Sequence, residues 1–173
     1  MKSIIAIFGV AMALSVGTAS AQWTFQAALY GTNEVGPNAS PATGFGTVLL
    51  NAAQTQITVN ESWSGLTGPA TASHIHGPAG PGVIANVVFP FSGVPSATSG
   101  SIPQQTFTIT AAQVSTLFAG QYYMNVHTGN FPGGEIRGQL ILVPEPSTAA
   151  LLGLGVGGFV LQAYRKRAKR LQG

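Results

Sequence analysis

The sequence predicts an all-β protein: a single β-sandwich or barrel of Greek-key type with one short helix. Three observations favour this fold. Between Trp23 and Val143, short segments that alternate apolar and polar residues are separated by Gly, Pro and Asn. The chain has no βαβ alternation and no repeat of solenoid or propeller period. With 173 residues and a targeting segment at each end, it has room for one domain.

Eight segments have the alternation and the β-branched or aromatic content of strands. The expected strands are residues 24–30, 44–51, 54–63, 72–76, 83–88, 105–110, 121–128 and 135–143. A Gly- and Pro-rich stretch, residues 77–82, is expected to form a tight ordered loop between two of them.

One helix is expected before the last two strands. Thr110 and Gln113 have the spacing of a capping box, in which each side chain bonds the other residue's backbone amide. Val114, Leu117 and Phe118 then form one apolar stripe, and Gly120 provides the stop. The pattern predicts one or two helical turns that close the β domain.

The N-terminus has the pattern of a secretory signal peptide. Lys2 is followed by an apolar run, residues 4–16, and then by the small residues Ala19 and Ala21 around Ser20. A positive charge, a short apolar core and a small-x-small site predict cleavage after Ala21. We expect residues 1–21 to be removed and the domain of residues 22–143 to be exported.

The C-terminal residues 144–173 contain three parts in a fixed order. Pro144, Glu145 and Pro146 precede an uncharged stretch of about 18 residues, which as a helix would span roughly 27 Å, and five basic residues follow within 165–170. The positive-inside tendency would keep that basic end in the cytoplasm.

This order resembles the PEP-CTERM sorting signal of Gram-negative bacteria. The resemblance implies that an exosortase recognises the tail and cuts it near the Pro-Glu-Pro motif, and that the protein is held at the inner membrane before it reaches the cell surface or the extracellular matrix. The alternative, a plain single-pass anchor, predicts the same orientation with a retained tail.

The distribution of charge excludes nucleic acid as a partner. The chain has a formal charge of +3, but its basic residues lie at the two ends apart from Arg137, and residues 23–143 carry −2 from three Glu and that Arg. The chain has no Cys, which excludes disulfides, thiolate zinc sites and a Cys nucleophile.

Two sequence blocks carry a second resemblance. The first is Ala-Ser-His-Ile-His-Gly-Pro-Ala-Gly at residues 72–80, and the second is Tyr-Tyr-Met-Asn-Val-His-Thr at 122–128, followed by Phe-Pro-Gly-Gly-Glu-Ile-Arg-Gly-Gln-Leu at 131–140. Together they resemble the CHRD domain, found as repeats in chordin and as a single unit in many bacterial secreted proteins. The resemblance implies no particular ligand here, because chordin's growth-factor partners do not occur in a bacterial envelope.

All three His residues of the chain lie in these blocks. Residues two apart on a strand share a face, so His74 and His76 project together while Ile75 points to the core. His127 is expected on the same kind of polar face, with Tyr123 and Asn125. If the two strands lie close together, the three imidazoles converge on a copper or zinc site.

Two other interpretations of the polar residues stay open. His74 and His127 can instead bond backbone carbonyls or Glu135 and so fix the two Gly-rich loops. Glu135 and Arg137 lie two apart on one strand, where they can pair with each other or orient a metal-bound His.

The sequence contains no phosphate loop, no nucleophile elbow and no carboxylates paired by spacing. It therefore favours an exported module of the cell envelope that binds rather than catalyses. One alternative is a copper- or zinc-binding protein that uses the three His residues. Another is adhesion or polysaccharide binding through aromatic residues such as Trp23, Trp63 or Tyr123.

Overall fold

Along the first strands of the domain, every second side chain is buried, and this alternation gives the sheet one face that packs into the core. The computed structural model describes residues 22–144. The strands are β1 (Trp23–Tyr30), β2 (Thr43–Leu50), β3 (Gln56–Ser64), β4 (Ala70–His76), β5 (Val87–Pro90), β6 (Gly100–Ser101), β7 (Gln105–Thr108), β8 (Tyr123–Thr128), β9 (Ile136–Gln139) and β10 (Ile141–Val143). The helices are a 3₁₀ turn, η1 (Gly31–Asn33), and α1 (Ala111–Phe118).

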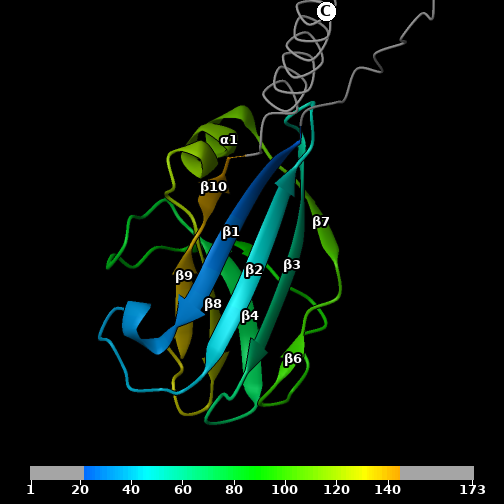
Figure 1. The fold of residues 1–173 in the computed structure, drawn as a ribbon. Coiled ribbons are helices and arrows are strands. Elements are labelled where there is room, and N and C mark those ends of the chain that lie inside the picture. The colour runs from blue at the N-terminus through cyan, green and yellow to red at the C-terminus, as the bar shows by residue number, and fades with distance from the viewer. Residues whose placement is uncertain (1–21, 145–173) are drawn as a thin grey trace, which may run out of the picture.

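All ten strands belong to one antiparallel sheet, which is curled into a half-barrel (Figure 1). The order along the sheet is β5-β4-β8-β9-β1-β2-β3-β6, with β10 paired to β1 and β7 paired to β3. The all-β class and the single short helix are confirmed. The more specific prediction of a Greek-key sandwich or barrel is replaced by one continuous sheet. In the described residues, no hydrogen-bonded pairing between β5 and β7 closes this sheet into a barrel.

The concave face of the curled sheet holds the apolar core. Phe25, Leu29, Val48 and Met124 are fully buried there. The two far parts of the sheet also meet through side chains, because the rings of Phe89 on β5 and Phe107 on β7 lie 5.3 Å apart between centroids. This contact lets a single sheet enclose a core without a second layer.

Helix α1 covers one end of the half-barrel, beside β10 and the start of β1 (Figure 1). The expected capping box is present, with the Gln113 backbone amide donating to the Thr110 hydroxyl and the Thr110 amide donating to the Gln113 side chain. Val114 and Leu117 are buried, whereas Phe118 is partly exposed and packs edge-on against Trp23. Gly120 follows the helix with φ +66°, in the left-handed region expected for the stop.

Two strand expectations are wrong in detail. The segment 83–88 forms a strand only from Val87, because residue 85 is bonded to side chains: its carbonyl accepts from the His76 ring and its amide donates to the Tyr123 hydroxyl. The segment 135–143 is split into β9 and β10 at Leu140, whose side chain turns inward and is fully buried. Contacts with side chains elsewhere in the fold cannot be inferred from the local alternation of apolar and polar residues.

The two expected targeting segments lie outside the described residues, apart from Pro144. Residues 1–21, with Ala19 and Ala21, and residues 145–173, with Glu145, Pro146 and the expected membrane-spanning helix, are therefore not placed. Within residues 22–144, no helix has the length and apolar character needed to cross a bilayer.

Candidate metal centre

Strands β4 and β8 are neighbours in the sheet, and their register brings the three His residues together. His74 lies opposite Asn125, His76 lies opposite Tyr123, and His127 lies opposite Ala72. Ser73, Ile75, Met124 and Val126 alternate with these residues and face the core. Because side chains alternate along paired strands, the His residues share the outer, polar face.

The three imidazole rings form one cluster. The ring centroids are 5.0 Å apart for His74 and His127, 5.3 Å for His74 and His76, and 6.1 Å for His76 and His127. One nitrogen from each ring can be chosen so that all three lie within 4.8 Å of one another. His74 Nδ1 and His127 Nε2 are the nearest pair, 3.2 Å apart.

Backbone carbonyls fix the orientation of two of the rings. The Nδ1 of His76 lies 2.9 Å from the Ala85 carbonyl oxygen, and the Nδ1 of His127 lies 2.9 Å from the Pro132 carbonyl oxygen. A carbonyl only accepts, so each Nδ1 carries the hydrogen and each neutral ring presents the Nε2 lone pair. The same two bonds fix the loops that contain Ala85 and Pro132, so loop fixing and metal ligation use different nitrogens.

One acceptor atom in the cluster is left in need of a partner. His76 Nε2 is buried and has no hydrogen-bond partner. His127 Nε2 lies 3.0 Å from the Asn125 side-chain oxygen, which is also an acceptor, and 3.2 Å from His74 Nδ1, which can donate to it in one tautomer. A metal ion among the three rings would satisfy His76 Nε2 and would lie beside the Asn125 oxygen.

The rings are neutral at neutral pH. Burial, followed by repulsion from His127 and His76, lowers the pKa of His74 to about 4. Burial also lowers the pKa of His76 and that of His127, although their bonds to Ala85 and Pro132 act in the opposite direction. Neutral imidazole is the form that binds a metal ion.

The cluster geometry is close to that of a metal site. Two nitrogens bound to one tetrahedral ion at about 2 Å lie about 3.3 Å apart, close to the 3.2 Å between His74 and His127. The third nitrogen lies farther away, so the His76 ring would have to move toward the pair. The set is three nitrogens without a thiolate or carboxylate, a combination that suits copper and zinc.

A stack of flat groups supports the cluster from one side. The Tyr123 ring lies parallel to His76, with centroids 4.9 Å apart and planes 4° apart, and the guanidinium carbon of Arg137 lies 3.4 Å from the centre of the Tyr123 ring. The Nη2 of Arg137 donates to the carbonyls of Gly80 and Val83. Arg137 therefore holds the 77–86 loop and touches the His residues only through Tyr123.

Glu135 is not part of the His cluster. Its fully buried carboxylate accepts four hydrogen bonds, from the Thr67 amide and from the hydroxyls of Ser40, Thr67 and Thr128. The expectations that Glu135 pairs with Arg137 or orients a metal-bound His are wrong for this structure, because all four hydrogen bonds to its carboxylate come from Ser40, Thr67 and Thr128.

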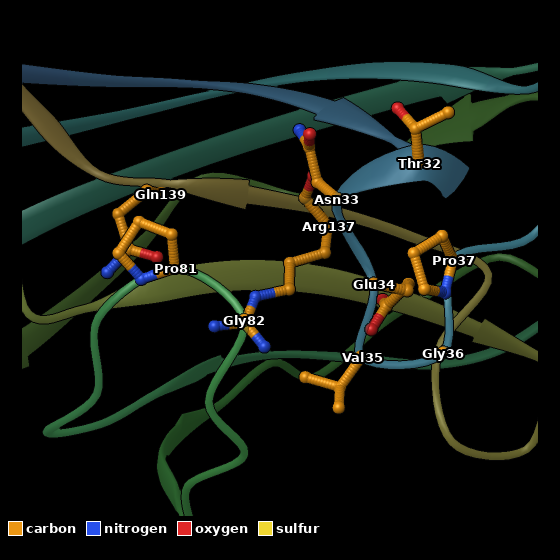
Figure 2. A pocket seen from close by; sticks show the side chains of 10 residues that line it. All are labelled: Thr32, Asn33, Glu34, Val35, Gly36, Pro37, Pro81, Gly82, Arg137 and Gln139. Atoms are coloured by element: carbon orange, nitrogen blue, oxygen red, sulfur yellow. The ribbon is translucent and has the colours of Figure 1, made fainter.

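A cavity of about 420 Å³ opens beside the cluster, lined by His76, Tyr123, Asn125, Arg137 and the loops around residues 34–38 and 130–134. It adjoins a second cavity of about 470 Å³, in which Arg137 reaches toward the loop at Pro81 and Gly82 while Glu34 lies on the other side (Figure 2). A metal ion bound by the three His residues would thus border a space that admits a small molecule.

Glu34 is a polar residue of this site that the motif analysis missed. The residue is 8% exposed, and its buried Oε1 has no hydrogen-bond partner. Burial raises its pKa, against the opposing effects of the Arg137 charge and of hydrogen bonds from Asn125 and Val35. The scarcity of charge was the one available signal, because Glu34 is among only four charged residues in 22–144.

The family model of the CHRD domain matches residues 25–140, which include all the strands that form the cluster. The chain belongs to the CHRD family. The model of the PEP-CTERM protein-sorting motif matches residues 142–166, directly after this CHRD domain. No curated protein and no solved structure gives a significant match to the chain. A PEP-CTERM motif is sorted by an exosortase, and it marks this CHRD protein for export and membrane-associated sorting to the cell surface.

Proposed function

We propose that this CHRD protein binds one copper or zinc ion at the cell surface through His74, His76 and His127, and that it acts by binding rather than by catalysis. The observation that carries the proposal is the convergence of one nitrogen from each neutral ring within 4.8 Å. Two of these rings are already oriented by carbonyls, which reduces the entropy lost when a metal binds.

Copper is the better fit of the two metals. Sites made of nitrogen ligands bind divalent copper more tightly than zinc, because affinity follows the Irving–Williams order. Binding requires no loss of protons from the ligands, since burial already keeps the three rings neutral.

Metal uptake is the direct test. The purified full-length chain, prepared without a His tag and stripped of metal, is expected to take up about one equivalent of Cu²⁺ and to show nitrogen hyperfine structure from its imidazoles in the electron paramagnetic resonance spectrum. A variant with His74→Ala, His76→Ala and His127→Ala is expected to bind at least 100-fold more weakly, because it has lost all three ligands.

The control is Gln104→Ala, a change at an exposed residue in the connection between β6 and β7 that should leave copper uptake unchanged. Uptake of zinc but not copper would support the three-His site and identify zinc as its metal. A folded wild-type chain that takes up neither ion would leave the His residues with the loop-fixing role alone and would refute the proposal.

The details of sorting form a second proposal, supported by the PEP-CTERM match. Residues 1–21 act as a signal peptide that is cut after Ala21, and the helix expected in 147–164 holds the chain in the inner membrane until an exosortase cuts near Pro144, Glu145 and Pro146. Mass spectrometry of the surface form is expected to give a chain that begins at Gln22 and lacks the tail, whereas Glu145→Ala should keep the tail. A surface form that ends at Gly173 would contradict the cleavage and favour a plain anchor.

A further inference from the structure

A groove crosses the outer face of β1, β2 and β3, away from the His cluster. It has a volume of about 430 Å³ and is lined chiefly by Ala28, Tyr30, Thr43, Phe45, Ser62 and Ser64. Tyr30 is 46% exposed and Phe45 is 45% exposed, so both rings are available to a ligand. Nothing in the described part of the chain covers this face, which is turned toward the viewer in Figure 1.

The strand register fixes how the groove is built. Ala28, Phe45 and Ser62 form one row across the three strands, and Tyr30, Thr43 and Ser64 form the next. The two aromatic residues are therefore diagonal neighbours, with Cα atoms about 7–8 Å apart. Each ring has a Ser or Thr hydroxyl beside it, and the rigid sheet holds the arrangement in place.

The next two rows of this face are uncharged and, apart from Leu49, polar. The next row is Gln26, Thr47 and Asn60, and the row after it is Thr24, Leu49 and Thr58. Hydroxyl and amide groups can donate and accept hydrogen bonds without any preference for a charged ligand.

The whole described surface lacks charged Asp, Glu, Lys and Arg side chains. The four residues of these types in 22–144 are Glu34, Glu61, Glu135 and Arg137, and none is more than 8% exposed. A polyanion or a charged protein would find no complementary partner on this face. An uncharged ligand with many hydroxyls would meet aromatic faces and neutral hydrogen-bonding groups.

The aromatic residues that the sequence suggested for polysaccharide binding are largely buried. Trp63 is 4% exposed and Tyr123 is 3% exposed, and Trp23 is half-buried against α1. Tyr30 and Phe45 are instead the two most exposed aromatic residues of the described part of the chain.

We propose that the groove between Tyr30 and Phe45 binds a neutral polysaccharide. The apolar C–H face of a pyranose ring lies on the aromatic rings, where contact removes apolar surface from water and the C–H bonds meet the negative ring faces. The sugar hydroxyls bond the hydroxyls of Thr43, Ser62 and Ser64. This binding is independent of the metal, because the groove and the His cluster lie on different strands.

The test is affinity electrophoresis of the full chain, in a detergent without a sugar headgroup, through gels that contain a defined polymer. The probes are two neutral polymers, dextran and hydroxyethyl cellulose, and the anionic polymer alginate. Retardation by at least one neutral polymer is expected. The double variant Tyr30→Ala, Phe45→Ala should weaken that binding by at least tenfold, and Ser62→Val, which keeps both rings, should weaken it less.

The control is the double variant Val83→Ala, Ile84→Ala, which removes exposed apolar side chains from a different surface and should bind like the wild type. Three results would overturn the proposal: no retardation by either neutral polymer, equal or stronger retardation by alginate, or unchanged binding by a folded Tyr30 and Phe45 variant. If the wild type forms a dimer but binds neither neutral polymer, and the Tyr30 and Phe45 variant does not form the dimer, the groove is instead a contact between copies of the chain.

Discussion

Replacing Glu61 with Gln is expected to stabilise the domain above neutral pH and to remove the contribution of one titrating group from the pH dependence of its stability. Glu61 lies on the core side of β3, is 2% exposed and contacts the hydroxyl of Ser73 on β4. That hydroxyl also lies 2.9 Å from the Asn125 carbonyl, so its one hydrogen can go either to Glu61 or to this carbonyl. When the hydrogen goes to the carbonyl, a protonated Glu61 can donate to Ser73, and a Gln amide can do the same.

The direction of the effect follows from the pKa of Glu61. Burial raises this pKa from 4.5 to about 8, although the bond with Ser73 opposes the shift. Near pH 7 the folded chain keeps the proton while the unfolded chain has lost it, so unfolding releases a proton and stability falls as pH rises. The contribution is complete below pH 4.5 and is lost as pH approaches about 8.

Urea unfolding at pH 6.5 and pH 7.5 measures this effect. The folding equilibrium constant of the wild type, divided by that of Glu61→Gln, should fall about eightfold over this one pH unit. The His residues titrate with the opposite sign, since their pKa values are lowered by folding, but they are common to both chains and cancel in the ratio. A ratio that does not change with pH would show that Glu61 is ionised in the folded chain.

Replacing Glu135 with Gln is expected to lower the free energy of unfolding by about 3 kcal/mol, because a fully buried carboxylate with four donors loses its charge and half of its accepting oxygens. For a domain of this size, the midpoint of thermal unfolding should fall by about 10 °C. The donors come from Ser40, Thr67 and Thr128, so the change loosens three separate segments at once.

The pH dependence of this variant separates it from the Glu61 variant. Burial by itself would raise the pKa of Glu135, but the hydrogen bonds from Ser40, Thr128 and Thr67 lower it further than burial raises it. Its stabilising effect is thus present above pH 4.5 and is lost as pH falls below that value. Glu135→Gln should therefore keep the wild-type slope between pH 6.5 and 7.5.

Copper uptake by folded Glu135→Gln distinguishes an architectural role from a role in metal binding. We expect unchanged uptake, because Glu135 contacts none of the three His residues. A variant that is as stable as the wild type but binds copper more weakly would contradict the structure. It would indicate that Glu135 orients a metal-bound His.

Local patterns were sufficient for some parts of the site. The spacing of two residues between His74 and His76 placed both on one face, and the apolar row of Met124 and Val126 placed His127 on the matching face of its own strand. These are consequences of a two-residue strand period, which depends only on neighbouring residues. The capping box at Thr110 is equally local, and the structure confirms it.

The partners of the charged residues could not be predicted in this way. Glu34, Glu61 and Glu135 have different surroundings: a cavity beside Arg137, a core hydroxyl, and a set of four hydrogen-bond donors. Most of the residues in these surroundings are distant in the chain, as Ser40 and Thr67 are from Glu135, so the spacing of the carboxylates along the sequence carried no information about them. The expected Glu135–Arg137 pair failed for this reason.

The sequence by itself determined the class of the fold, the CHRD and PEP-CTERM assignments and the face on which each His lies, because all of these depend on local periodicity or on linear motifs. Only the tertiary structure decided that β4 pairs with β8, that one sheet curls around the core in place of two packed sheets, and that every Glu and the one Arg of the described domain are buried. Strand pairing joins residues some 50 positions apart, and the free energy that selects it comes from burying both strands against a shared core rather than from either strand alone.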